Sequence, residues 1–152
     1  MANGWNSNWN NYLLKLEKEF KIIFKSKYAI PTSSCTGGMH LILKALNVDE
    51  KDEILMPSLN YIASANSVLY CNSNPHFIEI ENTTLGVDPT KLRNYLKKIV
   101  RRKNNLSYNK RSKKLIKGII VLHTFGHPCK IDKIKKICDE YNLRLIEDSA
   151  EA

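Results

Sequence analysis

Long hydrophobic runs are missing from this 152-residue sequence. No stretch approaches the roughly 18 to 20 uninterrupted apolar residues that a membrane-spanning helix needs. The N-terminal segment MANGWNSNWNN also lacks the basic residues and apolar run that mark a secretory signal. The sequence therefore predicts a soluble cytoplasmic protein with no membrane segment, and its length suits one ordinary globular domain.

Paired cysteine motifs are absent as well. None of the four cysteines belongs to a CxxC pair, so we expect reduced thiols in a reducing compartment. The metal-binding residue types that lie closest together are His123, His127 and Cys129. Their loop contains Gly126 and Pro128, and no second cluster completes a four-ligand site, so no metal is predicted.

Acidic residues are missing from one long block. Residues 97–117 hold ten Lys or Arg and no Asp or Glu, more positive charge than the net +9 of the whole chain. Such a block could bind nucleic acid or another polyanion. It contains a single aromatic, Tyr108, and no recognisable nucleic-acid motif, so a solvated connection between a helix and a strand is favoured and nucleic-acid binding is the weaker alternative.

Short apolar runs alternate with segments of helical periodicity along the chain. Helices are expected over 11–24, 36–48, 61–70, 89–100 and 130–142, and strands over 27–33, 53–58, 75–81, 117–126 and 143–148. Asp88 followed by Pro89 is a strong helix start, with Asp as the N-cap. The alternation indicates βαβ units with right-handed crossovers. The predicted fold class is therefore α/β, with three layers around a mostly parallel sheet.

Ligands of such folds bind beyond the carboxyl ends of the strands. The segment SSCTGG, with Thr36 and Gly37, opens a helix there and could bind a phosphate, although such residues at a helix start more often serve as simple caps. Tyr61 lies at the N-terminus of the next helix, where its ring could stack on a planar ligand or pack in the core. Asp148 and Glu151 stand at the end of the last strand, where a carboxylate can be functional but is more usually an N-cap or a surface residue.

One ligand would use these features together. Pyridoxal 5'-phosphate (PLP) needs a phosphate site, a stacking partner for its ring, and an anion that keeps its pyridine nitrogen protonated. The protonated ring is what withdraws electrons from the substrate. The combination therefore indicates PLP as the cofactor.

The residues of these motifs and their order along the chain resemble those of a known family. The sequence is similar to the sugar aminotransferases of the DegT/DnrJ/EryC1/StrS group, which have the aspartate aminotransferase type of PLP fold, fold type I. The resemblance covers nearly the whole chain and is carried by TSSCTGGMHLILKAL, DEILMPSLNYIASANSVLY, PHFIEIENTTLGVDPTKL and VLHTFGHPCKIDKIKKICDEYNLRLIEDSAEA.

This resemblance implies roles for particular residues. Thr36 and the backbone of Gly37 would hold the cofactor phosphate, and Tyr61 would stack on the pyridine ring. Asp148 would pair with the pyridine nitrogen, and Glu151 would lie near the ring hydroxyl. The implied reaction is transfer of an amino group, usually from glutamate, to the keto group of a nucleotide-linked deoxysugar, in making surface polysaccharides or glycan modifications.

The family's catalytic lysine has no counterpart here. In the family it follows a Ser-Phe pair beyond the segment that EDSAEA resembles, and no lysine of this sequence has that context. Residues 1–152 are therefore expected to be the N-terminal half of the large domain, without the lysine segment and the small domain, and to be inactive alone. The intact enzyme is expected to be a homodimer.

Two other interpretations remain open. The chain could be a non-catalytic module, either a degenerate relative that keeps the fold or a half that works beside a separately encoded one. It could also be a basic nucleic-acid-binding domain, whose binding would fall steeply with salt and depend on residues 97–117.

Overall fold

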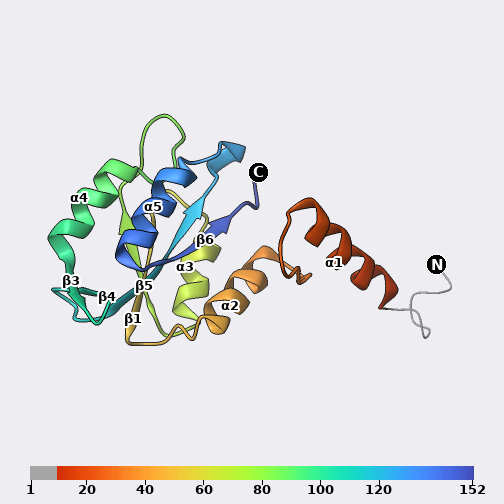
Figure 1. Ribbon diagram of the computed structural model, residues 1–152, viewed down its shortest axis with the longest axis horizontal. Helices are drawn as coiled ribbons and strands as arrows, with labels where there is room; N and C mark the ends of the chain where they lie inside the picture. Colours follow the sequence, from red (N-terminus) through yellow and green to blue (C-terminus); the bar gives the residue numbers. More distant parts are fainter. Residues whose placement is uncertain (1–9) are drawn as a thin grey trace. The chain divides into compact units, whose positions relative to one another are not determined.

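The computed structural model describes residues 10–152 of the chain, which divides into two compact units, Met1–Gly38 and Met39–Ala152 (Figure 1). Over the described residues, every helix is too short or too polar to cross a membrane.

The first unit contains helix α1 (Asn11–Ile23), which confirms the helix predicted from apolar spacing. None of its residues is buried. Leu16 and Phe20 of this helix line a small hollow together with Ile30 and Pro31 from the segment that follows.

The strand predicted over 27–33 does not form, so that prediction is wrong. A strand needs a partner with which to share its backbone hydrogen bonds, and the described part of this unit contains no other strand. Pro31 also has no N–H to donate to a ladder. The apolar side chains that suggested a strand face the hollow beside α1 instead.

The second unit is built on one sheet (Figure 1). Its strands are β1 (Asp52–Pro57), β2 (Asn74–Ile78), β3 (Val100–Lys103), β4 (Leu106–Asn109), β5 (Leu115–Leu122) and β6 (Arg144–Asp148). They lie in the order β2-β1-β5-β4-β3, and β6 also pairs with β5. β4 pairs with β5 at Leu115 and β6 pairs with it from Gly118 onward, so these two strands share one side of β5 at successive positions.

Helices cover both faces of this sheet. The helices are α2 (Cys35–Ala45), which begins in the first unit, α3 (Ile62–Leu69), α4 (Pro89–Ile99) and α5 (Ile131–Tyr141), with a short 3-10 turn η1 (Thr124–Gly126). Alternate strand residues face opposite ways. Leu55 packs in one core cluster with side chains of α4 and α5, whereas Ile54 and Met56 pack in the other with side chains of α2 and α3. The predicted three-layer α/β architecture is confirmed.

The start of α4 also confirms its prediction. Asp88 is the N-cap, Pro89 is the first helical residue, and the Asp88 carboxylate accepts hydrogen bonds from the backbone N–H groups of Thr90 and Lys91 at 2.8 and 3.1 Å. The local sequence therefore fixes this helix end without help from distant residues.

The basic block between α4 and β5 differs from its prediction. Instead of a plain solvated connection, it forms the hairpin β3–β4, paired antiparallel. Asn104 and Asn105 join the strands with φ values of 50° and 60°, as the central residues of a type I′ turn require. The sheet is consequently mixed: β1, β2, β5 and β6 are parallel, and the hairpin supplies the antiparallel pairs.

Candidate cofactor site

Asp148 ends strand β6 and lies buried, with 6% of its surface exposed. Its Oδ2 accepts a hydrogen bond from Ser64 Oγ at 3.0 Å, and its Oδ1 accepts one from the backbone N–H of Ala150 at 3.2 Å. An ionised carboxylate can accept about four hydrogen bonds. These two bonds orient the carboxylate, and a buried carboxylate at this strand end suits a group that receives a pyridinium N–H.

Ser64 is a site residue that the sequence reasoning missed. It lies in the first turn of α3 with 4% of its surface exposed, and its partner Asp148 lies 84 residues later in the chain. The helix predicted over 61–70 is rich in small residues such as Ala63, Ala65 and Ser67. A small polar residue in such a helix was the available signal, but only the folded chain identifies its partner.

Tyr61 is the N-cap residue of α3, with an extended backbone and no side-chain capping bond. Its side chain is 71% exposed, so the alternative of core packing does not hold in this unit. The backbone N–H of Ser64 donates to the Tyr61 carbonyl at 3.0 Å, and the hydroxyl of the same serine contacts Asp148. The structure thus brings the predicted ring platform and the predicted carboxylate to one end of α3.

Glu151 has a role in the backbone structure near the same strand end. Its Oε2 accepts a hydrogen bond from the backbone N–H of Phe125 at 2.7 Å. Gly126 follows with a φ of +78°, and a Cβ built on it would lie only 2.9 Å from the Glu151 carbonyl oxygen. Glu151 therefore holds turn η1 against the segment after β6, and a glycine is needed where the two backbones approach.

The residues considered for a metal are arranged for another purpose. His123 Nδ1 accepts a hydrogen bond from the backbone N–H of Cys129 at 3.2 Å, and its Nε2 lies 3.3 Å from Glu147 Oε2. Burial, reinforced by the negative charge of Glu147, raises the pKa of the Cys129 thiol to about 11, so this thiol stays protonated. Among residues 10–152, no group of three or more His, Cys, Asp or Glu could hold a metal.

The predicted phosphate segment belongs to the first unit and the first turn of α2. The backbone N–H of Gly37 donates to Ser34 Oγ at 3.1 Å, and that of Gly38 donates to the Ser34 carbonyl at 3.0 Å. Ser34 therefore caps the helix, as the capping alternative anticipated. A phosphate bound here would share the Gly37 amide with Ser34, and Thr36 lies on the same helical turn.

The residues of the second unit fit the ring of PLP in chemistry. They supply a buried, oriented carboxylate for the pyridine nitrogen and an exposed aromatic ring for stacking. The helix start in the first unit supplies a hydroxyl and backbone N–H groups of the kind that phosphates prefer.

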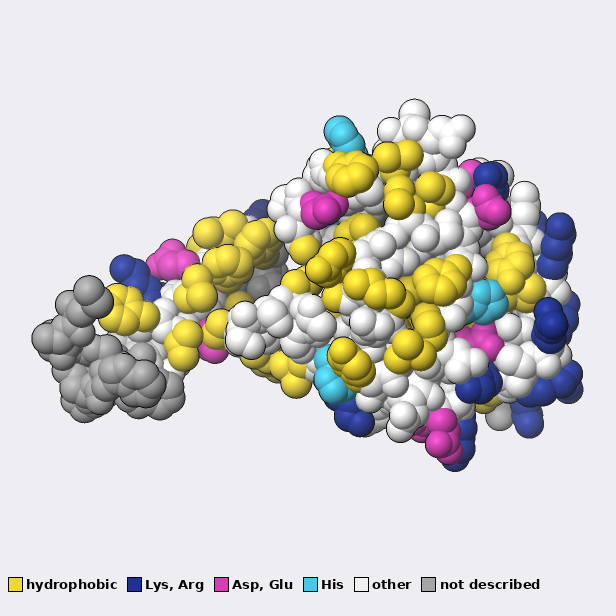
Figure 2. All heavy atoms as spheres, turned by 180° about the vertical axis from the view of Figure 1, so that it is seen from behind, with side chains coloured by type: hydrophobic (Ala, Val, Ile, Leu, Met, Phe, Trp, Pro, Cys, Tyr) yellow, Lys and Arg dark blue, Asp and Glu magenta, His cyan; other side chains and the backbone are white. Residues whose placement is uncertain are grey.

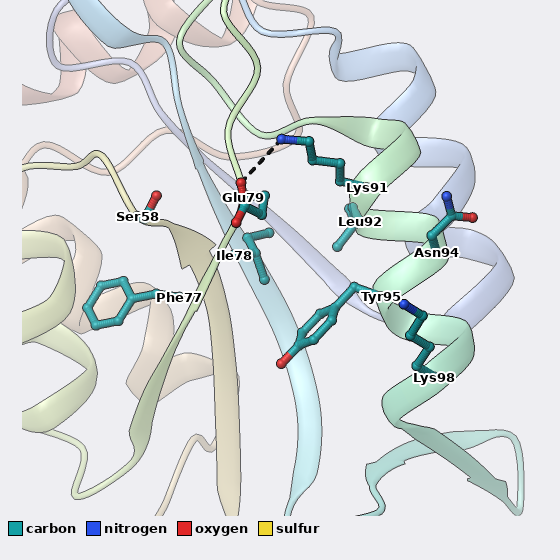
Figure 3. Close-up of a pocket in the computed structure, with 9 residues that line it drawn as sticks. All are labelled: Ser58, Phe77, Ile78, Glu79, Lys91, Leu92, Asn94, Tyr95 and Lys98. Carbon is teal, nitrogen blue, oxygen red and sulfur yellow. Dashed lines mark hydrogen bonds and ion pairs between the residues drawn. The ribbon is translucent and has the colours of Figure 1, made fainter.

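A cavity of about 580 Å³ lies between β2 and α4 (Figure 3). Lys91 and Glu79 form an ion pair at its rim, with Nζ and Oε2 3.2 Å apart. The Tyr95 hydroxyl, which also lines it, lies 2.9 Å from His76 Nε2. This cavity contains none of the residues predicted for the cofactor.

Relatives share both the sequence and the fold. A GDP-perosamine synthase of Vibrio cholerae is 35% identical over 149 residues, which are 98% of this chain and 36% of the relative. An aminotransferase of Psychrobacter cryohalolentis matches in structure with a TM-score of 0.75 and 29% identity, over 91% of this chain and 31% of that one. The chain thus spans about a third of the length of these relatives.

A further solved structure contains a form of the expected cofactor. It is that of ntda from Bacillus subtilis with bound pyridoxamine phosphate (PMP), with a TM-score of 0.73, 27% identity, and coverage of 90% of this chain and 28% of that one. The aminotransferases of the DegT/DnrJ/EryC1/StrS group depend on PLP. Their family model matches this sequence over residues 1–152, and the chain belongs to the DegT/DnrJ/EryC1/StrS aminotransferase family.

Proposed function

We propose that this chain supplies the ring-binding part of the PLP site in an enzyme that aminates a nucleotide-linked keto-deoxysugar. The amino donor is an amino acid, most simply glutamate, and the product serves surface polysaccharide or glycan synthesis in the cytoplasm. The observation that carries the proposal is the buried Asp148 carboxylate, which accepts a hydrogen bond from Ser64, the residue whose backbone N–H donates to the carbonyl of the exposed Tyr61. The similarity to a GDP-perosamine synthase supports a nucleotide-linked sugar as the substrate.

Asp148 keeps a proton on the pyridine nitrogen in this proposal. When bound, the cofactor supplies an electron sink for the bond that breaks at the substrate carbon. A buried carboxylate stabilises a neighbouring cation more than an exposed one does, because little water screens the pair. The hydroxyl of Ser64 fixes the direction of the Asp148 carboxylate, which would receive the N–H of the pyridine ring.

The other residues hold and orient the cofactor. The ring of Tyr61 would stack on the pyridine ring. Thr36 and the backbone of Gly37 hold the phosphate at the start of α2, where the helix dipole favours negative charge. Glu151 holds turn η1 beside the strand end and would lie near the ring hydroxyl of the cofactor.

We also propose that the chain alone does not transfer amino groups. The sequence contains no Ser-Phe pair, and none of its lysines has the context of the lysine that binds PLP covalently in the family. Activity then needs the lysine segment and the second domain of an intact enzyme, which we propose to be a homodimer with residues 1–152 as part of its large domain.

The binding test uses PMP, because PLP would react with the many lysine side chains of this basic chain. Equilibrium dialysis should show PMP binding to the chain and a loss of affinity of about tenfold or more in Asp148→Asn, since a hydrogen bond to a charged group contributes about 1.5–3 kcal/mol. Glu147→Gln is the matched control, because Glu147 is the neighbouring carboxylate and is half exposed. Equal affinity of wild type and Asp148→Asn would refute the proposal.

A further inference from the structure

The outer face of the β3–β4 hairpin carries a group of cations around an aromatic ring. Arg101 and Lys103 alternate along β3 and so share a face, and Tyr108 lies on that face as the cross-strand partner of Arg101. These three side chains, with Asn109, Lys110 and Lys113, line a hollow of about 300 Å³. We call it the hairpin basic pocket, and its lining contains no acidic residue.

The opposite face of the hairpin anchors it to the end of α5. Arg102 Nη1 donates to the Glu140 carbonyl at 2.7 Å, and Ser107 Oγ donates to the Tyr141 carbonyl at 2.5 Å. At the turn, Asn142 Nδ2 donates to the Asn105 carbonyl at 3.0 Å. These contacts fix the hairpin on the domain, so its outer face is organised before any ligand arrives.

The positive charge of this face is not neutralised within the chain. Of the ten Lys and Arg residues in 97–117, only Lys117 forms an ion pair with a carboxylate in the described structure, that of Asp52. Lys110 and Lys113 donate to backbone carbonyls instead. Figure 2 shows the Lys and Arg side chains gathered at the end of the second unit where β3, β4 and α4 lie.

Protection of a sheet edge explains only part of this charge. β3 is the last strand on its side of the sheet, and lysines on such a strand hinder pairing with other chains. Lys110 and Lys113 lie beyond the paired residues of the hairpin, yet they line the same hollow. Like charges held close together repel one another, so their convergence favours an anion as the missing partner.

We propose that the hairpin basic pocket binds a small anion of the nucleoside diphosphate class. Arg101 offers a planar fork that matches phosphate oxygens, and the lysines add point charges. The ring of Tyr108 provides a stacking surface for a base. A hollow of this size is at the lower end for small-molecule sites, which suits one nucleotide rather than a long strand. The pocket shares no residue with the proposed cofactor site.

The test is titration calorimetry of the whole chain with ADP and with inorganic pyrophosphate. Arg101→Gln combined with Lys103→Gln should weaken binding of both by about tenfold or more, because charge-assisted hydrogen bonds are lost. Lys133→Gln combined with Lys136→Gln is the matched control, since these exposed lysines of α5 remove the same charge away from the pocket and should change affinity by less than about twofold. Tyr108→Leu should weaken ADP but not pyrophosphate.

Several results would overturn the proposal. One is that ADP does not bind. Another is that the hairpin variant and the control lose equal affinity. A third is that ADP affinity is independent of Arg101 and Lys103, which would place the nucleotide elsewhere. Much tighter binding of a single-stranded oligothymidine that depends on the same residues would show that the ligand is nucleic acid. Circular dichroism of each variant checks that the exposed substitutions leave the fold intact.

Discussion

Replacing Ser64 with alanine tests how the Asp148 carboxylate is held. Both residues are buried, at 4% and 6% exposure, and the Ser64 hydroxyl donates to Asp148 Oδ2 at 3.0 Å. Loss of a hydrogen bond to a buried charged acceptor costs about 1.5–3 kcal/mol. For a chain of this length, each kcal/mol corresponds to a fall of about 2–4 °C in Tm. Because the carboxylate also loses its orientation, PMP should bind about tenfold more weakly.

Ser73→Ala is the matched control. Ser73 is similarly buried, at 2% exposure, and its hydroxyl donates to the Asp52 carbonyl at 2.9 Å. Asp52 is the first residue of β1, whereas Asp148 lies at the carboxyl end of its strand. Denaturant unfolding should show a loss of stability in both variants, whereas equilibrium dialysis should show weaker PMP binding only in Ser64→Ala. If both variants bind PMP as the wild type does, or both weaken equally, Ser64 does not position Asp148 for the cofactor.

Three other predictions concern stability. Burial raises the pKa of Glu53, but hydrogen bonds, led by that from His76, lower it more, from 4.5 to about 2. The ionised carboxylate should therefore add at most about 3 kcal/mol to the free energy of unfolding above pH 4.5, and this contribution should be lost toward pH 2. The free energies of unfolding of wild type and Glu53→Gln, measured with denaturant, should therefore converge as the pH falls from 4.5 to 2. A difference that stays constant with pH would contradict this. Gly118→Ala places a Cβ 2.6 Å from the Arg144 carbonyl oxygen and should cost about 1–3 kcal/mol, whereas an unchanged Tm would show that β5 and β6 can separate freely. Asp88→Ala removes the cap of α4 and should lower the free energy of unfolding, measured with denaturant, by about 1 kcal/mol. An unchanged free energy would show that water replaces the cap.

Local signals were enough to predict most of the second unit from its sequence. Strand β1 is a short apolar run closed by Pro57, and α5 has the apolar spacing of a helix with one buried face. Asp88 and Pro89 mark the start of α4 within two residues. Such features depend on neighbours in the chain, so the sequence alone contains them.

The features that sequence reasoning missed depend on distant residues or on a weak turn signal. The segment 27–33 has strand-like composition, but the described part of its unit, from residue 10 onward, holds no strand to pair with it. The hairpin was hidden by its charge, although Asn104 and Asn105 were a usable turn signal between two short runs. Ser64 could not be assigned because its partner lies on another strand, 84 residues away.

The candidate site was predicted in part. Asp148 and Tyr61 were chosen because of their positions at a strand end and a helix start, and the fold brings these two ends together through Ser64. The position of Gly37 at a helix start was also foreseen, and its amide is occupied by the Ser34 cap, as the capping alternative anticipated. Their roles toward PLP stay predictions until binding is measured.

The most direct test of the central claim is the NMR shift of the pyridine nitrogen of isotope-labelled PMP bound to this chain. The account predicts that Asp148 keeps this nitrogen protonated at a pH where free PMP has lost the proton, and that Asp148→Asn abolishes the difference. A pyridine nitrogen that titrates in the wild-type complex as it does in free PMP would contradict the assignment of Asp148 as its partner.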